Sequence, residues 1–260
     1  MRDVGLLFPG ASGDDPVDDV AVLRALLRTE VAWVRAQATA GLVPGPVADE
    51  VAAAADGLGT DAGPLTERVA AEAAAGGNPV IPLLAALRAA APEHAAVVHA
   101  GLTSQDVLDT ALVLVLRDAA ASATADLGRA CAAAARLARA HRDVPALGRT
   151  LAQAAVPTTL GARCAGWLSG LHAARTFLAD VGAVLPLAYG GAAGELSGAA
   201  RLTGDPFALV DAWGAELGLA VPPGPWHTVR TPVTRASATF AEACAALGHV
   251  AADVLQGTRP

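Results

Sequence analysis

The sequence predicts an all-α protein with a small N-terminal helical region followed by a bundle of long helices. Alanine is abundant, aromatic residues make up only 3% of the chain, and β-branched residues are sparse outside a few valine clusters. These features favour helix over sheet. The stretch 104–142 contains one glycine, Gly128, and no proline, so it predicts one very long helix. A chain of 260 residues with 53% hydrophobic content can fill a sizeable core.

An N-terminal domain of helices is predicted over 1–102. Apolar side chains recur at helical spacing over 17–40 and indicate an amphipathic helix, for which Asp14 or Asp15 followed by Pro16 is a suitable start. Three shorter helices, separated by glycine-rich joints, are expected at 46–56, 64–75 and 80–91.

The bundle is predicted over 103–260. Its three long helices are expected over 104–142, from Pro157 to Val184, and from Pro232 to Gln256. The second helix carries small residues that permit close helix packing: Ala162, Ala165, Gly166, Ser169, Gly170 and Ala173. Helices this apolar need partners on several sides, and the chain supplies few. We therefore expect a homo-oligomer, missing sequence, or both.

Charge and hydropathy exclude some functions. The net charge is −7 and every basic residue is arginine, without a basic cluster longer than a pair, which argues against a nucleic-acid partner. Uncharged stretches run to about 15 residues and contain glycine or proline, short of the ~20 residues of a membrane span. The first residues, Met-Arg-Asp-Val-Gly-Leu-Leu-Phe-Pro, offer no apolar stretch of signal-peptide length. We expect a soluble cytoplasmic protein, with Cys131, Cys164 and Cys244 as small core residues.

The strongest motif is the run from His99 to Ala111, His-Ala-Gly-Leu-Thr-Ser-Gln-Asp-Val-Leu-Asp-Thr-Ala, where a glycine-containing loop meets the start of the longest helix. Thr103 can cap the helix and Asp106 can occupy its third position, as in a capping box. The free amides and hydroxyls at the positive helix end can equally bind a substrate carboxylate. Both interpretations can hold at once.

This run resembles the first signature of the aspartase/fumarase superfamily, and its Ser-Gln-Asp-x-x-Asp-Thr-Ala form is similar to the muconate cycloisomerase and adenylosuccinate lyase branches. The resemblance implies that Thr103 and Ser104 bind a substrate carboxylate, with Gln105 and Asp106 beside them in the substrate site. It also implies that His99 takes part in proton transfer or hydrogen bonding, whereas the residues alone favour a structural histidine.

A second run, Gly148-Arg149-Thr150-Leu151-Ala152-Gln153, followed by Pro157-Thr158, resembles the second signature of the superfamily. Leu151 stands where most members have histidine, which favours the cycloisomerase branch over an ordinary succinyl-adduct lyase. The resemblance makes Arg149, Thr150 and Gln153 candidate carboxylate ligands; the alternative is a set of polar residues flanking a helix.

Further likenesses follow in family order: Gly77-Asn78-Pro79, Tyr189-Gly190-Gly191-Ala192-Ala193-Gly194 and Trp226-His227-Thr228-Val229-Arg230. By resemblance Asn78 and Arg230 bind substrate, and His227 lies near the reacting atoms. An arginine binds a carboxylate through two parallel hydrogen bonds. The family usually has aspartate after this arginine, and here Thr231 follows. The glycine run lacks the lysine and βαβ context of a phosphate loop.

The expected activity is that of a 3-carboxy-cis,cis-muconate cycloisomerase, in which a carboxylate adds to a conjugated double bond and forms a γ-lactone. The resemblance implies a tetramer, a small polycarboxylate substrate and no cofactor, and the sequence shows no metal-ligand cluster. The alternatives are a fumarate-releasing lyase of the same superfamily and a non-catalytic or split-enzyme scaffold. The last alternative arises because the third signature, a loop with a catalytic serine, does not occur in these 260 residues.

Overall fold

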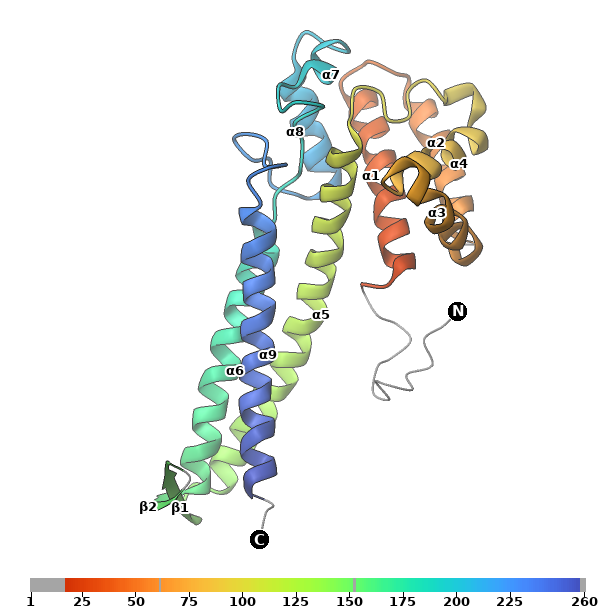
Figure 1. Ribbon diagram of the computed structural model, residues 1–260. Coiled ribbons are helices and arrows are strands. Elements are labelled where there is room, and N and C mark those ends of the chain that lie inside the picture. Colours follow the sequence, from red (N-terminus) through yellow and green to blue (C-terminus); the bar gives the residue numbers. More distant parts are fainter. Residues whose placement is uncertain (1–16, 61, 152, 258–260) are drawn as a thin grey trace. The chain divides into compact units, whose positions relative to one another are not determined.

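The computed structural model describes residues 17–60, 62–151 and 153–257, and most of these residues are helical (Figure 1). The predicted all-α class is confirmed. Within the described ranges the strands form a single antiparallel hairpin, β1 (Pro145–Thr150) with β2 (Gln153–Thr159). The described residues divide into two compact units, one within 17–117 and 184–232 and the other within 118–183 and 233–257. The predicted domain boundary at residue 102 follows chain order and stays a prediction.

The first unit is built on α1 (Asp19–Thr39), which packs against its neighbours in the sequence and against a helix from much later in the chain. The side chain of Asp18 accepts a hydrogen bond of 2.7 Å from the Ala21 amide and caps α1. The predicted starts at Asp14 and Asp15 lie outside the described residues. The other elements of this unit are α2 (Gly45–Thr60), α3 (Ala62–Gly76), α4 (Val80–Ala90), the 3₁₀ helix η1 (Pro92–His94), the beginning of α5 (Ser104–Ala140), α7 (Ser197–Ala200) and α8 (Pro206–Leu217).

Three aromatic residues form the centre of the first unit. The rings of Trp33, Tyr189 and Trp213 lie with centroids 5.1–6.0 Å apart, in stacked and edge-on arrangements. Both indole N–H groups donate to backbone carbonyls, Trp33 to Ala100 at 2.7 Å and Trp213 to Thr29 at 3.1 Å. This cluster therefore joins α1 to α8 and to the segment that leads into α5.

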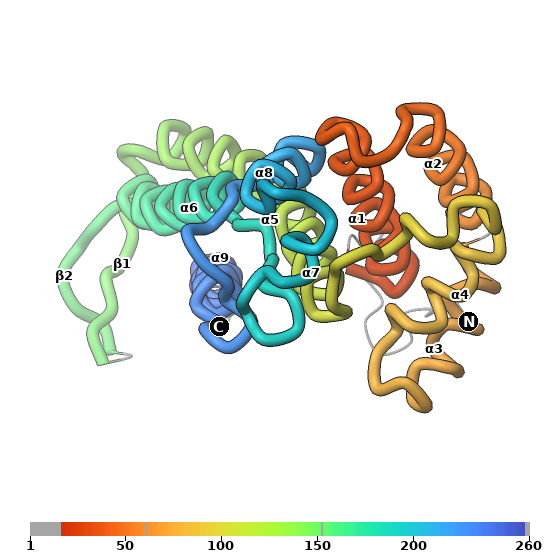
Figure 2. The backbone as a smooth tube through the Cα atoms, turned by 90° about the horizontal axis from the view of Figure 1, so that it is seen from above, coloured from red at the N-terminus to blue at the C-terminus, as the bar shows by residue number. Residues whose placement is uncertain are grey.

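The second unit contains the rest of α5 together with α6 (Leu160–Ala183), α9 (Thr231–Gly257) and the hairpin. Gly182 of α6 faces Ala120, and Gly128 of α5 faces Arg175, so the two helices run antiparallel with small residues at the contact. The Trp167 indole donates to Asp253 at 2.8 Å and joins α6 to α9. Figure 2 shows the two strands side by side, extending away from α6.

Several expectations need correction. The helix predicted from Pro157 begins at Leu160, because Pro157 and the two threonines after it pair with β1. α8 was not predicted. Cys164 is buried as expected, which raises the pKa of its thiol, but Cys131 is half-buried and Cys244 is exposed.

One helix differs from the expected hydropathy pattern. By length and composition alone α9 is long and apolar enough to cross a membrane, and it is the one such helix in the described ranges. A helix in the core of a soluble protein passes the same test, so this feature is weak evidence for a membrane span.

Candidate active site

The first turn of α5 has one half of the predicted capping box. The Thr103 amide donates to Oδ2 of Asp106 at 2.8 Å. The reciprocal bond from the Asp106 amide goes to the backbone carbonyl of Thr103, at 3.0 Å, and not to its hydroxyl. The hydroxyls of Thr103 and Ser104, both on half-buried residues, have no hydrogen-bond partner among the described residues. They are therefore available to a ligand at the positive end of the helix.

Asp106 is fully buried and anchors two loops to α5. Its Oδ1 accepts the amides of Gly190 at 2.8 Å and Gly191 at 3.2 Å. The same oxygen lies 3.0 Å from Nε2 of His227, although the angles are outside those of a hydrogen bond and the nitrogen has no other partner among the described residues. The 3.0 Å separation places the edge of the imidazole directly against the carboxylate. Asp106 thus positions its neighbours, and its direct contact with substrate stays a prediction.

Gly190 allows this close approach. A Cβ atom at this position would lie 2.8 Å from Pro225 Cβ and 3.0 Å from a carbon of the His227 ring. Any side chain there would push His227 away from Asp106. Within the glycine run that resembles a family motif, position 190 must therefore be glycine because His227 packs against it.

Arg230 is held by Asp109, which lies in the second turn of α5 and was not among the predicted site residues. Nη1 and Nη2 of Arg230 donate to the two carboxylate oxygens at 2.5 and 2.8 Å. The hydrogen bonds to Asp109 raise the pKa of Arg230, against the opposing effect of burial. Its guanidinium also lies 5.1 Å from the ring centroid of Trp226. Since 38% of the Arg230 side chain is exposed, a substrate carboxylate that binds there would share the guanidinium with Asp109.

His99 pairs with a residue that the sequence analysis missed. Its Nδ1 lies 2.7 Å from Oε1 of Glu30, a fully buried residue of α1. Glu30 lies on the buried stripe of α1 that also contains Leu26, Leu27 and Val34. Glu30 is the one charged residue among the buried residues of α1, and a charge at a position of the apolar period was the signal that could have identified it.

The remaining predicted residues are spread over both units. Asn78 accepts the Val80 amide at 3.0 Å and so supports the start of α4, while Gln105 is exposed on α5. The other three, all exposed, belong to the hairpin of the second unit: Arg149, Thr150 and Gln153. Leu151 occupies the turn with a φ of 50° and is 96% exposed. The motif residue Ala152 lies outside the described residues.

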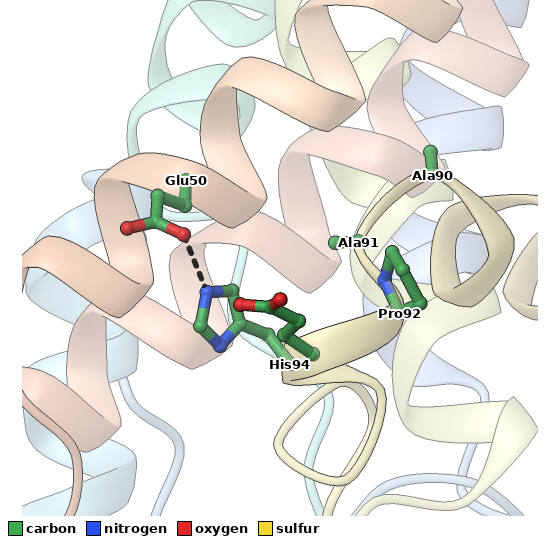
Figure 3. Close-up of a pocket in the computed structure, with 6 residues that line it drawn as sticks. Glu50, Ala90, Ala91, Pro92 and His94 are labelled. Atoms are coloured by element: carbon green, nitrogen blue, oxygen red, sulfur yellow. Dashed lines mark hydrogen bonds and ion pairs between the residues drawn. The ribbon is translucent and has the colours of Figure 1, made fainter.

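A pocket of about 280 Å³ opens elsewhere in the first unit (Figure 3). Its lining is Glu50, Ala90, Ala91, Pro92, Glu93 and His94, none of which was predicted as a site residue. Across the described parts of the chain, no group of three or more histidine, cysteine, aspartate and glutamate residues is arranged to hold a metal ion. The start of α5 therefore remains the candidate site.

Two available hydroxyls at a helix N-terminus, with histidines and an arginine held by buried carboxylates close to the same chain segments, suit an enzyme that binds a polycarboxylate and moves a proton. Comparison with known proteins supports an enzyme. A family described as lyase matches residues 18–256, and the chain belongs to this family, part of the aspartase/fumarase superfamily.

Individual relatives differ in their activities. A nitrosuccinate lyase of Streptomyces davaonensis is 45% identical over 97% of this chain and 55% of its own length. A 3-carboxy-cis,cis-muconate cycloisomerase of Bradyrhizobium diazoefficiens is 37% identical over 91% of this chain and 52% of its own length. The crystal structure of a fumarate lyase from Mesorhizobium sp. BNC1 matches with a TM-score of 0.81 and 35% identity, over 90% of this chain and 54% of that one. The chain thus spans about half the length of the proteins it resembles.

Proposed function

We propose that this chain contributes to the active site of a lyase that eliminates a substituent from a substituted succinate, with nitrosuccinate as the first candidate. The observation that carries this proposal is the 45% identity to a nitrosuccinate lyase over 97% of the chain. The geometry supports the same class of substrate, because the start of α5 offers two hydroxyls and a positive helix end to a carboxylate.

The reaction requires the protein to bind one carboxylate, to move a proton and to hold a second carboxylate. A proton leaves the carbon beside one carboxylate, its electron pair forms the new double bond, and nitrite leaves with the electrons of the carbon–nitrogen bond, so that fumarate remains. Thr103 and Ser104 are proposed to bind the carboxylate on which negative charge develops. His99 and His227 are the groups proposed to handle protons, and Arg230 to help hold a second carboxylate.

The second candidate is the predicted cycloisomerase activity on 3-carboxy-cis,cis-muconate. It is favoured by the 37% identity to a cycloisomerase and by Leu151 at the position where most of the superfamily has histidine. This substrate supplies its own carboxylate nucleophile, so the protein need only bind anions and deliver a proton to carbon.

One assay separates the two functions. The chain, and the longest form that its gene encodes, are each supplied with nitrosuccinate and with 3-carboxymuconate, and nitrite release and loss of diene absorbance are followed. We expect nitrite from the first substrate. Lactone formation without nitrite would favour the cycloisomerase, while turnover of neither substrate by either form would favour the non-catalytic scaffold. Ser104→Ala removes one of the two hydroxyls proposed to bind the carboxylate and should slow turnover. Ser122→Ala, an exposed change on α5, is its matched control.

We also propose that the protein acts as a homo-oligomer, in keeping with the tetramer predicted from the family resemblance. The six small residues predicted to pack closely on α6 are all exposed. A Cβ added at Gly166 or Gly170 would meet no atom of the described residues within 4 Å. Large apolar side chains of the same unit are also exposed: Leu137, Phe177, Leu247, Val254 and Leu255. Copies of the chain would cover such faces. The predicted cytoplasmic location belongs with this proposal.

A further inference from the structure

Asp109 is a carboxylate with almost no contact to solvent. Only 4% of its side chain is exposed, and its two oxygens accept from Nη1 and Nη2 of Arg230 at 2.5 and 2.8 Å. Taking a carboxylate out of water is costly, and two parallel hydrogen bonds from a guanidinium offset that cost best. Because 121 positions separate the two residues in the sequence, the pair fixes the direction of Arg230 relative to α5.

The turn that carries Arg230 meets α5 at a second point. Asp106 and Asp109 are three residues apart on α5 and lie on one face of the helix. They face His227 and Arg230, which are also three residues apart, with 3.0 Å between Asp106 Oδ1 and His227 Nε2. Nη1 of Arg230 also donates to the carbonyl of His227 at 3.4 Å, within the turn itself. The turn is therefore held in one register on the first two turns of α5.

Trp226 supports the guanidinium of Arg230, which lies over its ring at 5.1 Å from the centroid. Trp226 is buried, and its indole N–H donates to the carbonyl of Leu187 at 2.8 Å. The next residue, Ala188, is bonded through both its amide and its carbonyl to the hydroxyl of Thr110 on α5. The ring that contacts the guanidinium is thus tied to α5, as the carboxylate is.

We propose that Asp109 is a positioning residue, which holds the guanidinium of Arg230 ready for a substrate carboxylate. This inference rests on the proposed function, in which Arg230 helps to hold a second carboxylate. A guanidinium has five N–H groups and can serve two acceptors at once, and 38% of the Arg230 side chain is exposed, so a ligand can reach it. An unrestrained arginine loses conformational freedom when it binds an anion, whereas Arg230 is already ordered by Asp109 and Trp226.

Two other roles for Asp109 predict different results. If Asp109 only neutralised Arg230, its removal would strengthen the binding of an anion, because the positive charge would no longer be compensated. If Asp109 only supported the fold, its removal would weaken binding whether or not Arg230 is present. Positioning predicts weaker binding that depends on Arg230.

A double-mutant cycle measures this dependence. Asp109→Leu removes both acceptor oxygens at a similar side-chain size, and Arg230→Met removes the guanidinium. The double variant replaces the pair with two apolar side chains, a change that proteins often tolerate at buried ion pairs. Succinate, a dicarboxylate without a leaving group, is titrated by calorimetry into the longest form that the gene encodes. Asp109→Leu should weaken its binding on the order of 10-fold, but by less than about 2-fold when Arg230→Met is already present.

Asp126→Leu is the matched control, because Asp126 is also on α5 and pairs with an arginine, Arg129, but is 59% exposed. It should leave succinate binding unchanged. Tighter binding by Asp109→Leu, an equal loss in both backgrounds, or succinate binding that does not need Arg230 would each overturn the proposal, as would a wild type that does not bind succinate. If Asp109→Leu does not fold, Asp109→Asn takes its place in the cycle, since it replaces one acceptor oxygen with an NH₂ group that opposes the guanidinium, and the same outcomes decide.

Turnover separates this proposal from the proposed function. Nitrite release from nitrosuccinate tests the function, whereas the cycle uses binding alone. The expected coupling between Asp109 and Arg230 without nitrite release would refute the lyase and leave the positioning role standing. Nitrite release without that coupling would refute the positioning role and leave the lyase standing.

Discussion

Replacement of Asp106 tests the claim that this buried carboxylate anchors the start of α5. Asp106 accepts three backbone amides, from Thr103, Gly190 and Gly191, and none of its surface is exposed. Two variants remove different parts of this arrangement. Asp106→Ala removes both oxygens, whereas Asp106→Asn keeps the shape and one oxygen.

The expected losses follow from the number of amides left without an acceptor. An unsatisfied buried donor costs about 1–3 kcal/mol. In Asp106→Asn the remaining oxygen can still accept from Gly190 and Gly191, while the new NH₂ group faces the Thr103 amide, so a loss of about 1–3 kcal/mol is expected. In Asp106→Ala all three donors are orphaned, and because the loops can relax toward water, we expect about 3–5 kcal/mol.

Urea unfolding followed by circular dichroism and by tryptophan fluorescence measures both losses, and coincidence of the two transitions checks the two-state assumption. Asp49→Asn, an exposed change on α2, is the control and should stay within about 0.5 kcal/mol of the wild type. If Asp106→Asn loses no more stability than this control but loses ligand binding, the anchoring argument is wrong and Asp106 is a substrate ligand instead.

Four further predictions use other measurements. Ser104→Ala should weaken succinate-type carboxylate binding by about 1–3 kcal/mol in calorimetry with little change in unfolding, and equal losses would favour a capping role alone. Burial and, less strongly, the charge of Asp106 raise the pKa of Tyr189 from 10.0 to about 12. Its contribution to stability should therefore be complete below pH 10 and be lost as pH rises toward 12, and because the chain has one tyrosine, an absorbance titration with a midpoint near 10 would refute this. Gly170→Trp should reduce the oligomer in sedimentation without unfolding the chain, since a Cβ there meets nothing within 4 Å; an unchanged oligomer would exclude this face of α6. Residues 1–260 alone should turn over substrate orders of magnitude more slowly than a form with the closing loop of the family, and equal rates would show that the loop is dispensable.

Local patterns predicted most of the helices. Apolar periodicity over the long helices placed their ends within a few residues of those observed, because a helix depends on neighbours three and four positions away. The hairpin was not predicted, since strand pairing joins separate segments and Gly148 to Gln153 has no alternating pattern. α8 was missed although its signals are local: Asp205 caps the Ala208 amide, Pro206 occupies the first turn and Gly218 ends the helix with a positive φ.

In the candidate site, too, contacts between residues close in sequence could be predicted and contacts between distant residues could not. The bond between Thr103 and Asp106 was predictable because three residues separate its partners. Glu30 pairs with His99 across 69 positions and Asp109 with Arg230 across 121, and neither pairing has a signal in one sequence. Resemblance to the family predicted the histidine and the arginine as site residues, but which carboxylate pairs with each of them could be learned only from the structure.

Gly101 and Gly198 exclude side chains from each other. A Cβ at Gly198 would lie 1.9 Å from the carbonyl oxygen of Gly101, and a Cβ at Gly101 would lie 2.8 Å from the backbone of Gly198. In a library of variants, neither single substitution should survive a folding screen, and a change at one glycine should not be rescued by a change at the other, because both contacts are with backbone. Directed evolution of new substrate preference in this scaffold should therefore vary residues around Ser104 and leave this pair of glycines untouched.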